Sequence, residues 1–182
     1  MSSRPSPADL AAANGRSIPD VIAPGLAVLF CGINPGLWSA ATGHHFARPG
    51  NRFWPALHRA DFTPRQLRPD EQEDLLGYGL GITNLVARGS ARADELTRDE
   101  LVAGGAVLAA KLAEYRPRRL AVLGVGAYRT AFGARTATVG PQPTRIGDVP
   151  VWVLPNPSGL NAHYTLQRLA DEFAALRKAV TR

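Results

Sequence analysis

Apolar residues in this chain gather in short runs separated by longer segments of helical periodicity. The runs predict four strands, over residues 26–31, 81–86, 120–124 and 149–154. Within each run apolar residues follow one another instead of alternating with polar ones, which is typical of strands buried on both faces of a sheet.

Helical patterns fill the intervals, over residues 51–60, 70–76, 98–115 and 165–180. Thr97 is a capping residue type directly before the third segment, and Pro117 lies just beyond its end. In the last segment, apolar residues recur at spacings of three and four, as on one helix face: Leu166, Leu169, Phe173, Leu176 and Val180. Strands that alternate with helices predict an α/β fold, a three-layer α/β/α sandwich with a short, mostly parallel central sheet.

Length and composition predict one domain. The chain has 182 residues, of which 45% are hydrophobic, and this is enough for one sizeable core. Residues 1–22 are rich in Ser, Pro, Ala and Asn and lack apolar periodicity. We therefore expect a flexible or loosely packed extension over 1–22 and a single functional domain over 23–182.

Charge and cysteine content narrow the class of protein. The net charge of +6 and the pI of about 10.2 suit a polyanionic partner, although a generally basic surface explains them equally well. The single cysteine, Cys31, excludes an internal disulfide and fits a reducing compartment. Because no apolar run is long enough to span a membrane and no secretory signal is visible, we expect a cytoplasmic protein.

Two Asn-Pro loops each follow a predicted strand. "GINPG" (32–36) comes after the apolar run of 26–31, and "NPSG" (156–159) comes after that of 149–154. In a parallel sheet, the loops at the carboxyl ends of strands lie along one edge, where ligands bind. Asn34 and Asn156 are therefore expected to face one crevice.

Several kinds of chemistry fit these loops poorly. "GINPG" lacks the Lys and Ser/Thr of a P-loop and the three glycines of a dinucleotide site, and "NPSGL" is not the G-x-S-x-G of a serine hydrolase. His44 and His45 are adjacent, so their side chains point apart in most conformations, and no carboxylate cluster is near them in sequence. We expect neither a metal nor a cofactor.

Aromatic and basic residues interleave in "GLWSAATGHHFARPGNRFW" (36–54). This mixture suits a nucleobase stacked beside a phosphate backbone. Phe53 and Trp54 have the spacing of core residues in the following helix. Phe46 lies in a loop bounded by Gly and Pro, so it is the better candidate for contact with a base.

The stretch "FCGINPGLWSAATGHHFARPGNRFW", together with "VLPNPSGLN", closely resembles the mismatch-specific uracil-DNA glycosylases, the Mug and thymine-DNA glycosylase family. "GITNLV" and "LVAGGAVLAAKLAEYRP" occur in matching order, and the resemblance runs from about Ala23 to the last predicted helix. It implies the uracil-DNA glycosylase fold, flipping of a nucleotide out of double-stranded DNA that contains mismatched uracil, and hydrolysis of its N-glycosidic bond without metal or cofactor. We expect the protein to act as a monomer and, when bound to DNA, to associate with the bacterial nucleoid.

By this resemblance Asn34 is catalytic and orients the attacking water toward C1′ of the deoxyribose. An amide has no useful pKa for accepting a proton, so Asn34 can position water but cannot be an efficient general base. Catalysis must then rely on the departing base, and uracil leaves as an anion more readily than thymine. The alternative for Asn34 is an ordinary turn-forming residue before a proline.

The resemblance also implies a base pocket. Phe46 matches the position that stacks on the flipped pyrimidine, and the backbone near Ile33 and Asn34 is placed to donate to the base. Ser39, Asn156 and the two histidines are further candidates for the pocket wall.

The second loop matches the family's insertion wedge. Leu160 would fill the gap left by the flipped base, with backbone groups of Gly159 and Asn161 on the widowed guanine. The alternative for Leu160 is an ordinary core leucine. The candidate DNA-backbone contacts are Ser158, Arg48 and Arg52.

Asp94 follows the "GITNLV" strand and is a tentative second catalytic residue, as an activator of water or a stabiliser of the sugar cation. The alternative is a solvated loop acid or a helix cap. For the whole protein, two alternatives to a glycosylase stay open: a non-catalytic module that binds mismatches or abasic sites on the same fold, and a small-molecule nucleoside hydrolase.

Overall fold

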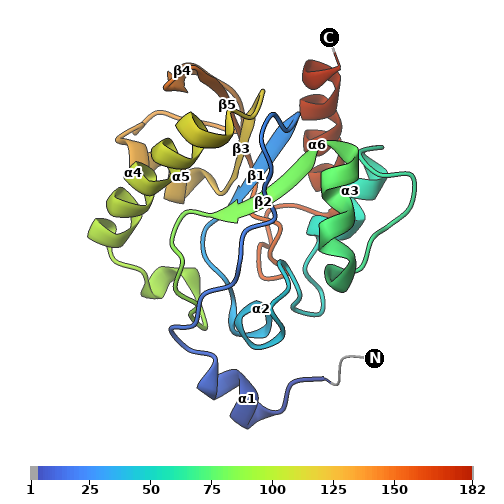
Figure 1. The fold of residues 1–182 in the computed structure, drawn as a ribbon, viewed down its shortest axis with the longest axis vertical. Helices are drawn as coiled ribbons and strands as arrows, with labels where there is room; N and C mark the ends of the chain where they lie inside the picture. The colour runs from blue at the N-terminus through green and yellow to red at the C-terminus, as the bar shows by residue number, and fades with distance from the viewer. Residues whose placement is uncertain (1–3, 182) are drawn as a thin grey trace.

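Five strands form one sheet in the order β2-β1-β3-β5-β4 (Figure 1). The strands are Val28–Gly32 (β1), Leu80–Asn84 (β2), Leu120–Leu123 (β3), Gly140–Ile146 (β4) and Val149–Leu154 (β5). Pairs β1–β2, β1–β3 and β3–β5 are parallel, and β4 is antiparallel to β5. This computed structural model describes residues 4–181, and it confirms the predicted α/β fold with a mostly parallel sheet.

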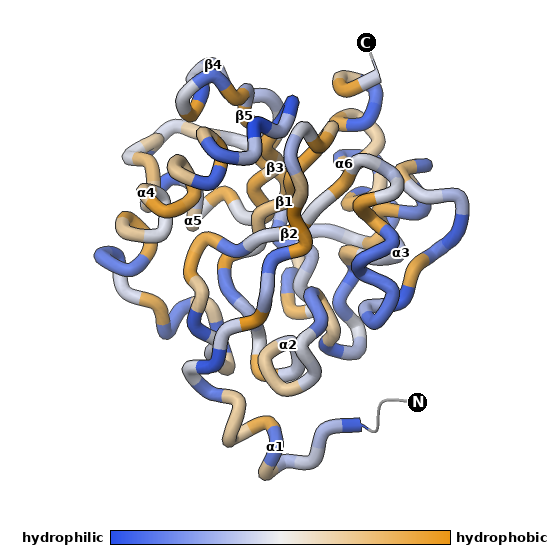
Figure 2. The backbone as a smooth tube through the Cα atoms, in the orientation of Figure 1, coloured by the Kyte–Doolittle hydropathy of each residue, from blue (hydrophilic) through white to orange (hydrophobic). Residues whose placement is uncertain are grey.

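Helices cover both faces of the sheet because successive β1 residues point to opposite sides. Phe30 contacts the aromatic rings of Phe53 and Phe173, which come from α3 (Phe53–Arg59) and α6 (Leu166–Val180). Leu29 and Cys31 belong to a second core cluster, beneath α4 (Arg98–Tyr115) and α5 (Val125–Phe132). Figures 1 and 2 show the result, an apolar sheet between two helical layers.

The two long helices match their predictions. Thr97 caps α4 in a capping box with Glu100, and the helix ends where Arg116 turns into the left-handed region before Pro117. In α6, the side chains of Leu169, Phe173 and Leu176 are fully buried, so the apolar stripe is the face packed on the sheet.

Other elements differ from the prediction. The segment predicted over 70–76 is a 3₁₀ helix, Pro69–Tyr78, and α3 begins two residues later than expected because the Asn51 side chain accepts a hydrogen bond from the Phe53 N–H. The apolar pattern did not reveal four short helices and the edge strand β4. The helices are α1 (Pro7–Ala12), α2 (Leu37–Thr42), α5 and the 3₁₀ turn Ala93–Glu95.

The prediction of a loosely packed extension over 1–22 is wrong for residues 13–22. Ala13 and Val21 are buried, and Val21 forms an antiparallel bridge with Ile82 in β2. Asp20 forms an ion pair with Lys111 of α4 and also accepts a hydrogen bond from Thr83. This segment therefore covers the β2 edge of the sheet, whereas residues 1–3 lie outside the described residues.

The carboxyl ends of β1, β2 and β5 meet at one edge of the sheet, as the parallel pairings require. The segments that follow these strands hold eight of the twelve predicted site residues, and the other four, Ser39, Phe46, Arg48 and Arg52, lie in α2 or between α2 and α3. Within residues 4–181, no helix combines the length and the apolar character needed to cross a bilayer.

Candidate active site

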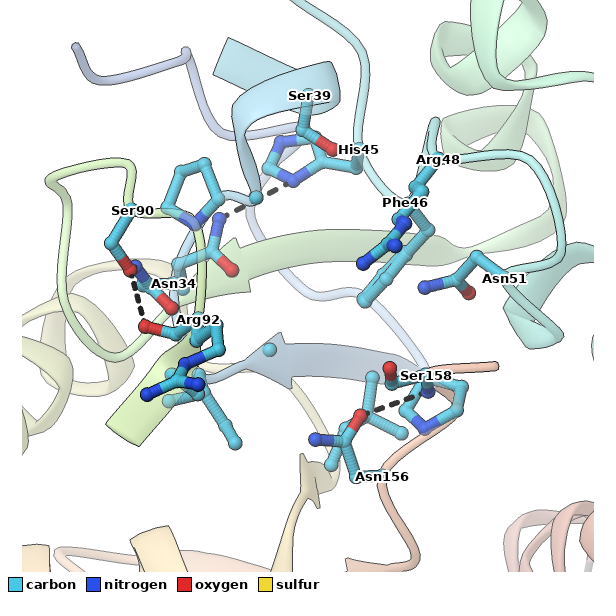
Figure 3. Close-up of a pocket in the computed structure, with 18 of the residues that line it drawn as sticks. Asn34, Ser39, His45, Phe46, Arg48, Asn51, Ser90, Arg92, Asn156 and Ser158 are labelled. Atoms are coloured by element: carbon cyan, nitrogen blue, oxygen red, sulfur yellow. Dashed lines mark hydrogen bonds between the residues drawn. The ribbon is translucent and has the colours of Figure 1, made fainter. Parts of the chain in front are cut away.

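A pocket of about 440 Å³ opens at this edge of the sheet (Figure 3). Its wall comes from the ends of the parallel strands and the loops after β1, β2 and β5, from Ser39 of α2 and the segment between α2 and α3, and from Ile18 of the N-terminal segment. Ten predicted site residues line it: Ile33, Asn34, Ser39, Phe46, Arg48, Asp94, Asn156, Ser158, Leu160 and Asn161. Gly159 and Arg52 do not, although both lie in or beside the loop after β5.

The orientation of the Asn34 amide is fixed by its neighbours. Nδ2 donates to the Arg88 carbonyl oxygen at 2.9 Å and to Ser90 Oγ at 2.8 Å. Ser90 Oγ donates its own proton to the Arg92 carbonyl at 2.7 Å, so it can only accept from Asn34. Both amide hydrogens are thus used, and the carbonyl oxygen, which has no partner within residues 4–181, is left to accept a hydrogen bond from water.

The loop after β2, whose residues Arg88 and Ser90 accept hydrogen bonds from Asn34, is itself anchored. The Arg88 guanidinium forms two hydrogen bonds with the Glu100 carboxylate, which lies in the first turn of α4. The hydrogen bond from Arg88 is the main reason that the pKa of Glu100 falls to about 2. Main-chain hydrogen bonds also join this loop to the loop after β1, from Val86 to Ile33 and from Ser90 to Pro35. Asn34 is therefore held by a rigid support.

Phe46 forms one side of the pocket. Its backbone has φ of 53°, which is uncommon outside glycine, and its ring stacks on Phe53 with centroids 4.2 Å apart. Phe53 covers one face of the ring, and Figure 3 shows the ring directed into the pocket. Phe46 is thus a flat apolar surface supported from behind by the core.

Asn84, at the end of β2, is a site residue that the sequence reasoning missed. Its Nδ2 lies 3.4 Å from Nδ1 of His45, and Nε2 of His45 lies 2.8 Å from the Pro19 carbonyl. Because a carbonyl only accepts, Nε2 carries the proton, and Nδ1 of the neutral ring accepts from Asn84. Burial lowers the pKa of His45, which favours this neutral form. The sequence did not mark Asn84 as a strand end, because it lies within the run predicted as a strand over 81–86, whereas β2 ends at Asn84.

Gly32 makes room for this arrangement. A Cβ at Gly32 would lie 2.6 Å from Oδ1 of Asn84 and 3.4 Å from the Phe46 ring. Any side chain would displace one of them, because 2.6 Å is well inside van der Waals contact.

Hydrogen bonds within the 156–164 loop hold its shape. The Ser158 N–H donates to Oδ1 of Asn156, the Leu160 N–H donates to Oγ of Ser158, and Nδ2 of Asn161 donates to the Asn156 carbonyl. Leu160 lies at the tip with 70% of its surface exposed, so it is not a core leucine. The polar side chain of Asn156 shapes the loop.

Two expectations for this loop need correction. The Asn161 N–H donates to the Ser158 carbonyl, so it is not free for a guanine; in this loop, Gly159 is the better candidate. Arg52, expected to contact the DNA backbone, has its partners within the protein. Its guanidinium donates to three carbonyl oxygens of the loop, those of Ser158, Asn161 and Tyr164.

Asp94 lies on the pocket rim, where its carboxylate accepts a hydrogen bond from Nε of Arg92 at 3.0 Å. Both side chains are 69% exposed. This exposed ion pair resembles the alternative of a solvated loop acid more closely than a buried catalytic carboxylate. Within residues 4–181, no cluster of three or more His, Cys, Asp or Glu side chains is arranged to hold a metal ion.

Comparison with known proteins relates this architecture to a family. Residues 19–180 match the family described as the uracil DNA glycosylase superfamily. The fold is also similar to the solution NMR structure of a Methanosarcina acetivorans protein described as a "putative Uracil DNA glycosylase". The TM-score is 0.64 at 18% sequence identity, over 92% of this chain and 99% of that one. Since the family match covers nearly the whole described chain, the protein belongs to the uracil DNA glycosylase superfamily.

Proposed function

We propose that the protein is a monofunctional DNA glycosylase that flips uracil out of double-stranded DNA, preferentially from G:U mismatches, and hydrolyses its N-glycosidic bond. Weaker action on thymine and modified cytosines is part of the proposal. The observation that carries it is the Asn34 amide, whose two hydrogens are used by Arg88 and Ser90 so that its oxygen is free in a pocket with room for a nucleobase.

In this reaction, the Asn34 side-chain oxygen accepts a hydrogen bond from a water molecule. This contact directs the oxygen atom of the water at C1′. The bond between C1′ and N1 of the base breaks, the base takes the electron pair, and the water oxygen forms the new bond to C1′. The water gives up its proton to the departing base or to solvent. Because an amide cannot take that proton, the rate depends on how well the base carries negative charge, which favours uracil over thymine.

The base would be recognised by Phe46 and Asn84. Phe46 offers a stacking surface, and the Asn84 amide presents a donor and an acceptor side by side, a match for O4 and N3–H of uracil. The contact with His45 supports this role, because it fixes which way the Asn84 amide faces.

Two arginines of the pocket wall are candidates for contact with the DNA backbone. Arg48 and Arg92 are exposed on the pocket wall and are suited to the phosphates that flank the flipped nucleotide.

Lysine occurs only at 111 and 178, and the amino group of Lys111 is paired with Asp20. This supports monofunctional chemistry, because no lysine at the pocket is available for a Schiff base.

The direct test is a panel of labelled duplexes with G:U, A:U, G:T and G:C pairs, incubated with excess protein and then treated with alkali. Alkali breaks the strand only where a base has been removed, so we expect cleavage at uracil, fastest opposite guanine, and no cleavage without alkali. Tight binding of G:U and abasic duplexes without any uracil release would instead identify a non-catalytic binding module.

A further inference from the structure

We propose that Arg52 is a positioning residue that holds the 156–164 loop in the shape that presents Leu160. The loop and the first turn of α3 are 106 residues apart in sequence, counted from Arg52 to Ser158, yet one side chain joins them. The proposal deepens the proposed function, because it rests on Leu160 acting as a wedge in duplex DNA.

The contacts of Arg52 span most of the loop. Nη2 donates to the carbonyl oxygens of Ser158 and Asn161, the latter at 2.9 Å, and Nη1 donates to that of Tyr164. The main-chain N–H of Arg52 donates to the Pro157 carbonyl at 2.9 Å. The loop carbonyls on both sides of Leu160 are thus fixed to a single planar group, which only an arginine fork can provide.

The chain before Arg52 supports the loop at a second point. A Cβ at Gly159 would lie 2.8 Å from the Gly50 carbonyl oxygen, so the absence of a side chain at Gly159 allows the loop to lie directly on the 50–52 segment. Leu160 follows Gly159 and points outward with 70% of its surface exposed. Its exposed position therefore depends on the support beneath it.

The same contacts distinguish Arg52 from an arginine that is available to bind a phosphate. Both terminal nitrogens face loop carbonyls, the Nε atom is buried without a partner in the described residues, and the side chain is only partly accessible. Arg48, by contrast, is exposed and its side chain makes no hydrogen bond within residues 4–181. The two arginines, four residues apart, should therefore respond differently to salt.

The first test measures the loop directly and does not depend on activity. In Arg52→Gln, hydrogen exchange of the backbone amides in residues 158–164 should accelerate by about tenfold or more, as expected when the contacts that close a loop are lost. The matched control is Arg59→Gln, which removes the same charge from the exposed end of α3 and should leave this loop unchanged. Arg52→Lys keeps the charge but not the fork, so it should give an intermediate effect, and it serves if the Gln variant does not fold.

The second test is a double-mutant cycle on single-turnover uracil release. Arg52→Gln should slow release from a G:U duplex by about tenfold or more but have little effect on single-stranded substrate, which needs no wedge. In a Leu160→Ala background, Arg52→Gln should cost little further, because the residue that it positions is gone. Fluorescence of 2-aminopurine beside the uracil should show reduced flipping in the single variant.

Salt dependence separates positioning from phosphate contact. Arg48→Gln should lower the slope of log binding constant against log salt by about 1, whereas Arg52→Gln should leave it unchanged. Unchanged loop exchange, additive losses in the cycle, or a slope change for Arg52→Gln would each overturn the proposal. If wild-type protein releases no uracil from any substrate, the proposed function fails, while the exchange measurement still decides whether Arg52 holds the loop.

Discussion

Asn34 is an ordinary amide that its surroundings restrict to one orientation. Arg88 and Ser90 take its two hydrogens, and the Ser90 hydroxyl is itself committed to the Arg92 carbonyl. An amide free to flip would present NH₂ to the water half of the time, and an NH₂ group cannot accept the water's hydrogen. The orientation of the Asn34 amide therefore depends on Ser90 and on the Arg88 carbonyl.

Ser90→Ala tests this dependence. Without Oγ, one amide hydrogen of Asn34 loses its partner, so we expect single-turnover uracil release to fall by about tenfold, within the range known for misplaced catalytic groups. Binding to a G:U duplex should stay unchanged, since Ser90 is buried. Ser17→Ala is the control, because Ser17 is exposed and its side chain has no hydrogen-bond partner in the described chain. Unchanged release by Ser90→Ala would mean that Ser90 does not fix the amide.

His45 gives the base pocket a predicted dependence on pH. Burial is the main cause that lowers its pKa below the ordinary 6.5, so the neutral ring is the form that accepts from Asn84. Protonation would place a hydrogen on Nδ1 facing the Asn84 NH₂ group and disrupt the contact. As a group whose pKa is lower in the folded state, His45 supports folding fully above pH 6.5, and this support is lost as the pH falls below that value.

We therefore expect uracil release to fall on the acid side, with a midpoint below 6.5 that matches the His45 titration followed by NMR. A His45 midpoint at or above 6.5, or a rate that stays constant while His45 becomes protonated, would contradict the assignment.

Among the elements, those with strong periodicity were predictable. Strands β1 and β5 and helix α6 are continuous apolar runs or clean stripes, and their side chains are buried as expected. Strand β4 was not predicted, because Pro141 and Pro143 lack N–H groups and most of its residues are exposed, as an edge strand allows. α2 escaped because Gly36 caps it without a side-chain hydrogen bond and the helix has only 6 residues.

Helix α4 supports the active-site loops through Gly104. A Cβ at Gly104 would lie 2.1 Å from the carbonyl oxygen of Leu85. Leu85 begins the loop after β2, which contains Arg88 and Ser90. Alanine in a helix interior gains about 1 kcal/mol over glycine. Overpacking costs typically about 1–3 kcal/mol, and contact with a backbone atom belongs at the upper end of that range.

Gly104→Ala should therefore lower the free energy of unfolding by about 2 kcal/mol in urea titration, because overpacking exceeds the helix gain. Gly126→Ala in α5 is the matched control: it is exposed, with nothing within 4 Å of its Cβ, and should be neutral or stabilising. Equal stability of the two variants would show that α4 does not approach the loop this closely.

The 156–164 loop should matter only for duplex substrates. Leu160→Ala removes the exposed apolar tip and touches no core contact, so the free energy of unfolding should change by less than about 0.5 kcal/mol. Uracil release should slow by at least about tenfold on a G:U duplex and by much less on a single strand, since unstacking costs a few kcal/mol only in the duplex. Equal losses on both substrates would contradict a wedge.

At the scale of the whole molecule, the sheet brings together residues that are far apart in sequence. Asn84 ends β2, and Asn34 and Asn156 lie two residues beyond the ends of β1 and β5, so the strand order places all three around one pocket. The two Asn-Pro loops were predictable because each follows an apolar run. The contacts of Asn84 and Arg52 were not, because each depends on a partner that only the folded chain brings near, Pro19 through His45 in one case and the 156–164 loop in the other.

The packing of the N-terminal segment could not be predicted from its sequence either. Its composition suggested a loose tail, yet Val21 joins β2 and the Pro19 carbonyl fixes the His45 ring. Composition reports what a segment could do alone, whereas its packing here depends on the sheet edge that it covers. Residues 13–22 therefore pack as part of the folded domain.

The most direct test of the proposed role of Asn34 is single-turnover uracil release from a G:U duplex by wild-type protein and by Asn34→Ala. If the free carbonyl oxygen of Asn34 aims the water, removing it should slow release by about 100-fold or more while duplex binding is kept. Release by Asn34→Ala at the wild-type rate would show that the Asn34 oxygen does not position the water.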